Sequence, residues 1–216
     1  MKKGFNRDKP PPADSDLASQ TQAVYERQAK RFDAERAKSL YERDWLDRFL
    51  APIRRGGRIL DLGCGAGDPI AAYFVEKGFE VVGVDASEEM LALARRRLPD
   101  AEWLLGDMRT LDLPDRFDGV VAWNSFFHLM PSEQRDALRR MTRLMKAGAP
   151  LLLTVGDREG TETGWVGGEP IYHASLSSDE YRRVLDGLGV EVVDFVIEDP
   201  TCGDQTILLG RRRHES

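Results

Sequence analysis

This chain has little cysteine, no excess of positive charge and no long apolar run. Its two cysteines, Cys64 and Cys202, form neither a metal-ligand spacing nor a disulfide framework, which is typical of a reducing compartment. The formal net charge of −6 disfavours nucleic acid as a partner, because phosphate-rich partners usually meet a basic surface. No apolar run reaches the ~20 residues that span a bilayer, so we expect no membrane partner.

The first residues differ in composition from the rest of the chain. Residues 1–16 carry basic side chains and three consecutive prolines but no apolar core, so they do not form a secretory signal. We expect this segment to be a disordered lead-in and the chain to be cytoplasmic. Residues 17–216 predict a single domain, because a chain of 216 residues can bury one good core. The sequence leaves the oligomeric state open.

A helical pattern precedes the first predicted strand. Apolar residues recur at helical spacing through residues 17–53, which predicts one or two helices. Because this segment belongs to no strand–helix unit, we expect residues 17–56 to pack outside the core as a helical cap. Tyr25, Arg36 and Lys38 are the polar candidates for pointing inward. Each is equally compatible with a solvated position on an amphipathic helix.

Strand and helix patterns alternate through the predicted core, residues 57–210. The expected strands are residues 58–62, 80–85, 101–105, 117–123 and 149–155, and the expected helices are residues 69–77, 88–97 and 133–146. Asp68, Ser87 and Ser132 are the expected caps of those helices. The pattern predicts an α/β, doubly wound, Rossmann-like sheet.

The alternation of strand and helix stops after the fifth strand. Residues 156–173 are rich in glycine and acids, and we expect them to form a long irregular loop. A helix capped by Ser178 follows at residues 179–188. Residues 190–197 and 205–210 are then separated by a short loop, which predicts an antiparallel hairpin. The sheet should therefore have seven strands, mostly parallel, with one antiparallel strand near the C-terminus.

A glycine-rich turn follows the first strand. Gly63, Gly65 and Gly67 let the backbone approach a ligand closely, and the next helix offers free N–H groups at its start. The carboxyl ends of the other strands carry polar groups at the same edge of the sheet. These groups are Asp61, Asp85, Asp107, Asn124 to His128, and Gly156 with Asp157.

The carboxylates decide between two kinds of ligand. Asp85 ends the second strand, where an acid beside a glycine turn can accept both hydroxyls of a ribose. A nicotinamide dinucleotide would also place a pyrophosphate at the turn. Asp61 and Asp68 stand there with no base nearby in the sequence, which is a poor setting for two more negative charges. A cationic nucleoside without phosphate fits better.

Five short stretches occur in order along residues 58–155. They are Ile59–Gly67, Val81–Ser87, Gly106–Met108, Phe117–Val121 and Leu144–Gly148. As a set they resemble the successive motifs of the class I S-adenosylmethionine-dependent methyltransferases, in their small-molecule type. The resemblance implies S-adenosylmethionine as cofactor, S-adenosylhomocysteine as product and a small molecule as methyl acceptor. It implies no metal.

The resemblance also assigns residues to the cofactor. Asp61 and the glycines are expected around the methionine portion, Asp85 on the ribose, and Asp107 with Met108 near the adenine. The resemblance further implies that Ala86 and Met90 line the adenosine pocket and that Asn124 supplies backbone contacts. Apart from the resemblance, Tyr25 and Arg36 of the helical cap are expected cofactor contacts.

The segment after the fourth strand bears on the acceptor. Family members that methylate adenine or glutamine nitrogens carry Asn or Asp, then two prolines and an aromatic residue here, whereas this chain has Asn124-Ser-Phe-Phe127. That departure removes the case for methylation of a base or an amide. Residues 172–175 are similar to stretches in uncharacterised bacterial members, which give no substrate.

A general base is needed only for an alcohol, phenol or protonated amine. His128 and His173 are the candidate bases, and each is also compatible with a packed or capping histidine. The loop residues expected to shape the acceptor site are Asp157, Trp165, Glu169 and Tyr172. Two other functions remain open: a non-catalytic S-adenosylmethionine-binding or interaction protein, and, less favoured, a nicotinamide-dependent oxidoreductase.

Overall fold

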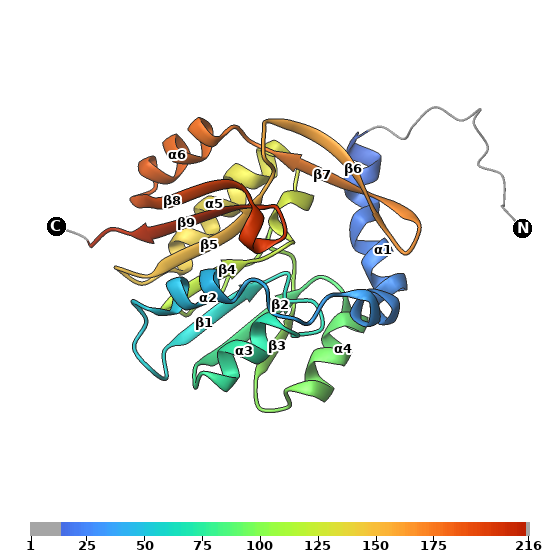
Figure 1. The fold of residues 1–216 in the computed structure, drawn as a ribbon, viewed down its shortest axis with the longest axis horizontal. Coiled ribbons are helices and arrows are strands. Elements are labelled where there is room, and N and C mark those ends of the chain that lie inside the picture. Colours follow the sequence, from blue (N-terminus) through green and yellow to red (C-terminus); the bar gives the residue numbers. More distant parts are fainter. Residues whose placement is uncertain (1–13, 215–216) are drawn as a thin grey trace, which may run out of the picture.

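The computed structural model describes residues 14–214, which are built around a seven-stranded sheet (Figure 1). The strand order is β3-β2-β1-β4-β5-β9-β8, and only β9 runs antiparallel to its neighbours. The mostly parallel sheet with one antiparallel strand is confirmed. Its strands are β1 (Arg58–Leu62), β2 (Glu80–Asp85), β3 (Glu102–Leu105), β4 (Gly119–Ala122), β5 (Pro150–Val155), β8 (Val190–Asp199) and β9 (Gln205–Arg212).

Helices cover both faces of the sheet. One face packs against α2 (Arg43–Leu50), α3 (Ile70–Glu76) and α4 (Glu88–Arg97), and the other against α5 (Pro131–Leu144) and α6 (Ser178–Gly187). Each face has its own apolar layer, as the near-continuous apolar strands β4 and β5 require. Two short 3₁₀ helices, η1 (Phe126–His128) and η2 (Pro200–Cys202), complete this part of the fold.

Helix α1 (Asp14–Glu35) stands apart from both layers, at the edge where the parallel strands end (Figure 1). It lies against a second, two-stranded sheet made of β6 (Gly160–Val166) and β7 (Glu169–Ser175) on one side and against α4 on the other. The backbone N–H of Tyr172 in β7 donates to Thr21 Oγ1 at 3.1 Å. The Gln22 side chain donates to the carbonyl of Ala86, just before α4, at 2.8 Å.

Three expectations about larger segments need correction. Residues 156–173 are mostly not a loop: they contain β6 and most of β7, joined by Gly167 and Gly168, which both take positive φ. Of the predicted cap, only α1 lies outside the core, because α2 buries Trp45, Leu46 and Phe49 against the sheet layer. Helix α1 begins three residues inside the expected lead-in, and residues 1–13 lie outside the described part of the chain.

Three predicted helix caps are also wrong, although Ser87 caps α4 as expected. Helix α5 starts at Pro131, whose missing N–H suits that position, and the Met130 N–H donates to the Glu133 carboxylate at 2.8 Å. Ser177, not Ser178, accepts the Glu180 N–H at the start of α6. Asp68 does not cap α3, because its carboxylate pairs with Lys38 and Arg97.

A close approach between β2 and β3 depends on glycine. The indole of Trp103 lies over Gly83, where an added Cβ would come within 2.2 Å of the ring. The same indole covers Gly67, where an added Cβ would come within 2.8 Å. The bulky ring thus takes the space of two missing side chains, and it packs the glycine turn against the sheet.

The first prediction follows from this packing. Gly83→Ala should lower the free energy of unfolding by about 1–3 kcal/mol, because the methyl group overpacks the contact with Trp103. Gly187→Ala is the control, since nothing lies within 4 Å of its Cβ position in α6. The control should leave stability unchanged or raise it by about 0.5–1 kcal/mol. Urea unfolding of both variants measures the difference, and equal effects would contradict the packing role.

Candidate active site

A cavity lies beneath α1 at the carboxyl ends of β1 and β2, and we call it the inner cavity. This is the place where ligands bind in doubly wound sheets, because the strand order reverses between β1 and β4. Most predicted site residues meet here although they come from distant parts of the chain. Those in its wall are Tyr25, Arg36, Asp61, Gly63, Gly65, Asp85, Ala86, Met90, Asp107, Met108, Asn124 and His128.

Gly67 is the exception among the predicted cofactor contacts. It does not belong to the wall of the inner cavity, and its Cα faces the indole of Trp103. Its glycine identity therefore serves packing of the turn.

Backbone N–H groups of the protein hold the carboxylate of Asp85 in place without a ligand. Its Oδ2 accepts the N–H of Gly65 in the glycine turn at 2.8 Å, and its Oδ1 accepts the N–H of Ser87 at 2.9 Å. Burial raises the pKa of Asp85, and the N–H groups of Ser87 and Gly65 oppose that rise. Each oxygen keeps a further lone pair for a hydroxyl group of a ligand.

Asp61 is the most isolated acid of the inner cavity. Its side chain is 2% exposed, and its Oδ2 has no hydrogen-bond partner among the described residues. Burial, reinforced by the charge of Asp85, raises the pKa of Asp61 to about 7. A buried acceptor of this kind calls for a donor, and a cationic ligand group would supply one.

Asp107 is already engaged by a base that sequence reasoning missed. The guanidinium of Arg109 donates from Nε to Asp107 Oδ2 at 2.8 Å and also contacts Glu133. Burial raises the pKa of Asp107, but the hydrogen bonds and charge of Arg109 outweigh burial and leave the pKa below its usual value. The pairing could have been found in the sequence, because Asp107 and Arg109 are two positions apart and both follow β3.

The glycine turn is less acidic in the fold than in the sequence. Asp68 pairs with Lys38 at 2.9 Å, and Arg97 from the end of α4 lies 3.6 Å from the same carboxylate. Both bases also pair with Asp33 of α1. The expectation that no base stands near the turn was wrong, since Arg97 is distant in sequence and packing brings it there. The two acids neutralise the two bases, so the network offers no net positive charge to a phosphate.

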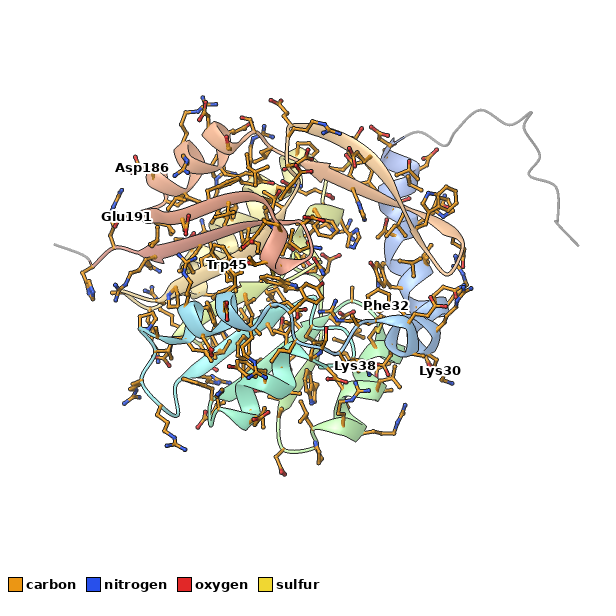
Figure 2. All side chains as sticks on the ribbon, in the orientation of Figure 1. Lys30, Phe32, Lys38, Trp45, Asp186 and Glu191 are labelled. Atoms are coloured by element: carbon orange, nitrogen blue, oxygen red, sulfur yellow. The ribbon has the colours of Figure 1, made fainter. Side chains whose placement is uncertain are left out.

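A second cavity adjoins the first, and we call it the outer cavity. Tyr25, Phe32, Arg36 and Asn124 belong to the walls of both cavities, so the two spaces share a boundary. Phe32 points from α1 toward this boundary, whereas the exposed Lys30 points outward (Figure 2). The sequence shows no sign of this role for Phe32, because an apolar residue at helical spacing in residues 17–53 indicates packing first.

The residues predicted to shape the acceptor site separate in the structure. Trp165 belongs to the wall of the outer cavity. Asp157, Glu169 and Tyr172 belong to the wall of neither cavity. Asp157 pairs with its neighbour Arg158, Glu169 binds Arg27 and Gln28 of α1, and Tyr172 is buried in a cluster with Leu17 and Ala174. The structure therefore brings only Trp165 of these four to the outer cavity, and their role at an acceptor site stays a prediction.

Both ring nitrogens of His128 have partners. Nδ1 lies 2.9 Å from the carbonyl oxygen of Tyr172, so Nδ1 carries the proton and donates it. Nε2 is then the acceptor, and the Tyr25 hydroxyl donates to it at 3.0 Å. Burial lowers the pKa of His128 to about 3. In this arrangement His128 orients Tyr25 and has no nitrogen left for a substrate proton.

His173 is the other predicted base, and it stands in the wall of the outer cavity. Its ring centroid lies 4.7 Å from Phe127 and 5.0 Å from His128. Burial lowers the pKa of His173, which keeps the imidazole neutral near pH 7.

Comparison with known proteins agrees with this geometry. The sequence profile described as a methyltransferase domain matches residues 59–148. Glycine N-methyltransferase of Mus musculus is 36% identical over 197 residues, which cover 78% of this chain and 65% of that protein. The chain spans about half the length of the curated relatives it matches.

Two solved structures share the fold. The amino pentose methyltransferase CalS10 of Micromonospora echinaspora, with bound S-adenosylmethionine, has a TM-score of 0.66 at 22% identity, covering 86% of this chain and 96% of that one. The 1,6-didemethyltoxoflavin-N1-methyltransferase of Burkholderia thailandensis, with bound S-adenosylhomocysteine, has a TM-score of 0.70 at 21% identity, covering 96% and 93%.

The ordered motifs, the matched profile and the strand order agree. Together they support a class I S-adenosylmethionine-dependent methyltransferase. The cofactor of the family is S-adenosylmethionine, and in this methyltransferase the inner cavity occupies the position at the strand ends where the fold binds its ligand.

Residues 14–214 contain neither a candidate membrane-spanning helix nor a candidate metal site. No helix there is long and apolar enough to cross a membrane. No group of three or more His, Cys, Asp or Glu side chains in the same residues is arranged to hold a metal ion.

The second prediction concerns His128. An unfolded histidine titrates near 6.5 and folded His128 near 3, so between these pH values the unfolded chain binds the extra proton. His128 therefore contributes a loss of stability of up to about 1.4 kcal/mol per pH unit as the pH drops below 6.5, whereas the raised pKa of Asp61 contributes a gain over much of the same range. The part due to His128 is read from the difference between variants. Urea unfolding across this range measures the slope.

His128→Gln should lose less stability, or gain more, than the unmodified chain as the pH drops below 6.5, because glutamine takes up no proton. His214→Gln, which removes an exposed histidine, is the control and should keep the slope of the unmodified chain. Identical slopes in His128→Gln and the unmodified chain would show that His128 is protonated in the fold.

Proposed function

We propose that this protein transfers a methyl group from S-adenosylmethionine to a small molecule. The observation that carries the proposal is the convergence of Asp61, Asp85 and Asp107 on one cavity at the strand ends. Three carboxylates suit a cation, hydroxyl groups and an amino group, and they oppose a pyrophosphate. This composition favours S-adenosylmethionine over a nicotinamide dinucleotide.

The residues present fit the cofactor. Asp61, with its unpaired buried oxygen, would hold the ammonium of the methionine portion, and Asp85 would accept the ribose hydroxyls. Arg36, also in the cavity wall, would face the methionine carboxylate. Asp107 and Met108 would border the adenine. The bound cofactor supplies a methyl group on a sulfonium, which is already an activated leaving group.

The chain's own residues then position the acceptor and exclude water. The outer cavity shares Tyr25, Phe32, Arg36 and Asn124 with the inner cavity, so an acceptor held there borders the cofactor. His173 stands in the outer wall as a neutral imidazole that can take up a proton. This second space beside the first favours an enzyme over a protein that only binds S-adenosylmethionine.

The third prediction tests the cofactor. Titration calorimetry with S-adenosylhomocysteine should show saturable binding, and Asp85→Ala should weaken it at least about tenfold by removing charge-assisted hydrogen bonds to the ribose. Asp100→Ala, which removes an exposed acid outside both cavity walls, is the control and should bind as the unmodified chain does. A folded protein that binds no S-adenosylhomocysteine would sink the proposal.

The fourth prediction tests Tyr25 and Arg36, which belong to the walls of both cavities. Tyr25→Phe and Arg36→Ala should each weaken S-adenosylhomocysteine binding about threefold or more, since each removes a polar group from the shared wall. Lys30→Ala, on the outward side of α1, should leave affinity unchanged. Unaltered affinity in both Tyr25→Phe and Arg36→Ala would return these residues to a purely structural role.

A further inference from the structure

Aromatic rings from four elements form much of the outer cavity. Tyr25 and Phe32 come from α1, Phe127 from η1, Trp165 from β6 and His173 from β7. Neighbouring rings meet edge to face: the centroids of Phe127 and His173 are 4.7 Å apart at 67°, and those of Tyr25 and Phe32 are 5.3 Å apart at 80°. Rings that support one another in this way form a rigid apolar wall, which suits a planar aromatic ligand.

The charged side chains in this wall already have partners. Glu35 pairs with Arg31 at 2.7 Å, and Arg36 pairs with the buried Glu42 at 3.1 Å. An ammonium or carboxylate that entered would lose its water and find Glu35 paired with Arg31, and Arg36 shared between Glu42 and the methionine carboxylate of the cofactor. The attraction between a cation and the aromatic faces is smaller than the cost of that lost water. The wall therefore selects against charged acceptors.

The candidate proton acceptor of the outer cavity, His173, also favours an uncharged acceptor molecule. The ring of His173 lies over Gly164 on the neighbouring strand, where an added Cβ would come within 2.4 Å of it. Burial lowers its pKa, so the imidazole is neutral but only a weak base. A weak base cannot strip the proton from an alkylammonium, whose pKa is close to that of lysine. It can take the proton that an uncharged hydroxyl or aromatic amine releases once the methyl group has made it strongly acidic.

We propose that the acceptor is an uncharged, planar aromatic molecule that is methylated on a hydroxyl or an aromatic amino group; this rests on the proposed function. A lone pair on that oxygen or nitrogen forms the bond to the methyl carbon as the carbon–sulfur bond breaks, and the bonding pair stays on sulfur. The proton of the acceptor passes to the imidazole of His173 and from there to water.

The experiment uses three probes with the same ring system and different charge. Protein saturated with S-adenosylhomocysteine is titrated at neutral pH with naphthol, with naphthylmethylamine, which is then a cation, and with naphthoate. Naphthol should bind at least about tenfold more tightly than either ion. Tighter binding of the cation or of the anion, or binding of none of the three, overturns the assignment.

Two matched variants test whether naphthol binds in the outer cavity. Phe127→Leu removes a ring from the outer wall and should weaken naphthol binding about tenfold. Phe195→Leu makes the same change at a half-buried ring on β8, outside both cavity walls, and should leave binding unchanged. Equal effects of the two variants would contradict binding in the outer cavity.

The failure of this inference is distinct from failure of the proposed function. A protein that binds no S-adenosylhomocysteine fails the proposed function before any probe is added. A protein that binds it and prefers a charged naphthalene keeps the proposed function and loses only the acceptor class.

Discussion

The carboxylate of Asp85 is the point on which the site depends. It accepts the N–H of Gly65 from the turn after β1 and the N–H of Ser87 at the start of α4. The Ser87 hydroxyl accepts the N–H of Met90 in α4 and donates to Glu26 of α1 at 2.6 Å. One side chain thus links the glycine turn, the second strand, a helix start and the helix that covers the cavity. A substitution here changes the shape of the site together with its charge.

Helix α1 is attached to the rest of the molecule by both polar and apolar contacts on each of its two flanks. Toward α4 it buries Ala29 against Met90, and Glu26 and the ion pair of Asp33 with Arg97 add polar contacts. Toward the β6–β7 hairpin it buries Val24 against Val166 and Ile171. Partly exposed ion pairs contribute little to stability each, so the buried apolar contacts on the two flanks contribute most to holding α1 in place.

The sequence predicted the parts of the structure that local patterns determine. The strand-end acids, the glycine turn and the Ser87 cap depend on residues a few positions apart, and the structure places them as expected. The hairpin at residues 160–175 was not predicted, because its outer face is polar and the glycines of its turn, Gly167 and Gly168, are also typical of an irregular loop. Its apolar face is buried by α1, which lies more than 100 residues earlier in the chain, so the sequence near the hairpin does not show what covers this face.

The roles of single side chains were hidden for the same reason. His128 looks like a free base until Tyr25 and the carbonyl of Tyr172 occupy its nitrogens, and both lie more than 40 residues away. Asp68 looks like an unpaired acid until Lys38 and Arg97 reach it. Sequence patterns record neighbours along the chain, whereas these assignments depend on neighbours in space.

The shared wall of the two cavities has a thermodynamic consequence. Tyr25, Phe32, Arg36 and Asn124 face both spaces, so a molecule that orders them in one space removes part of the ordering cost for a molecule in the other. Ligands in the two cavities would therefore be coupled through this wall, and the factor by which the first ligand favours the second would equal the factor in reverse. Cofactor and acceptor should each bind more tightly in the presence of the other, whichever enters first.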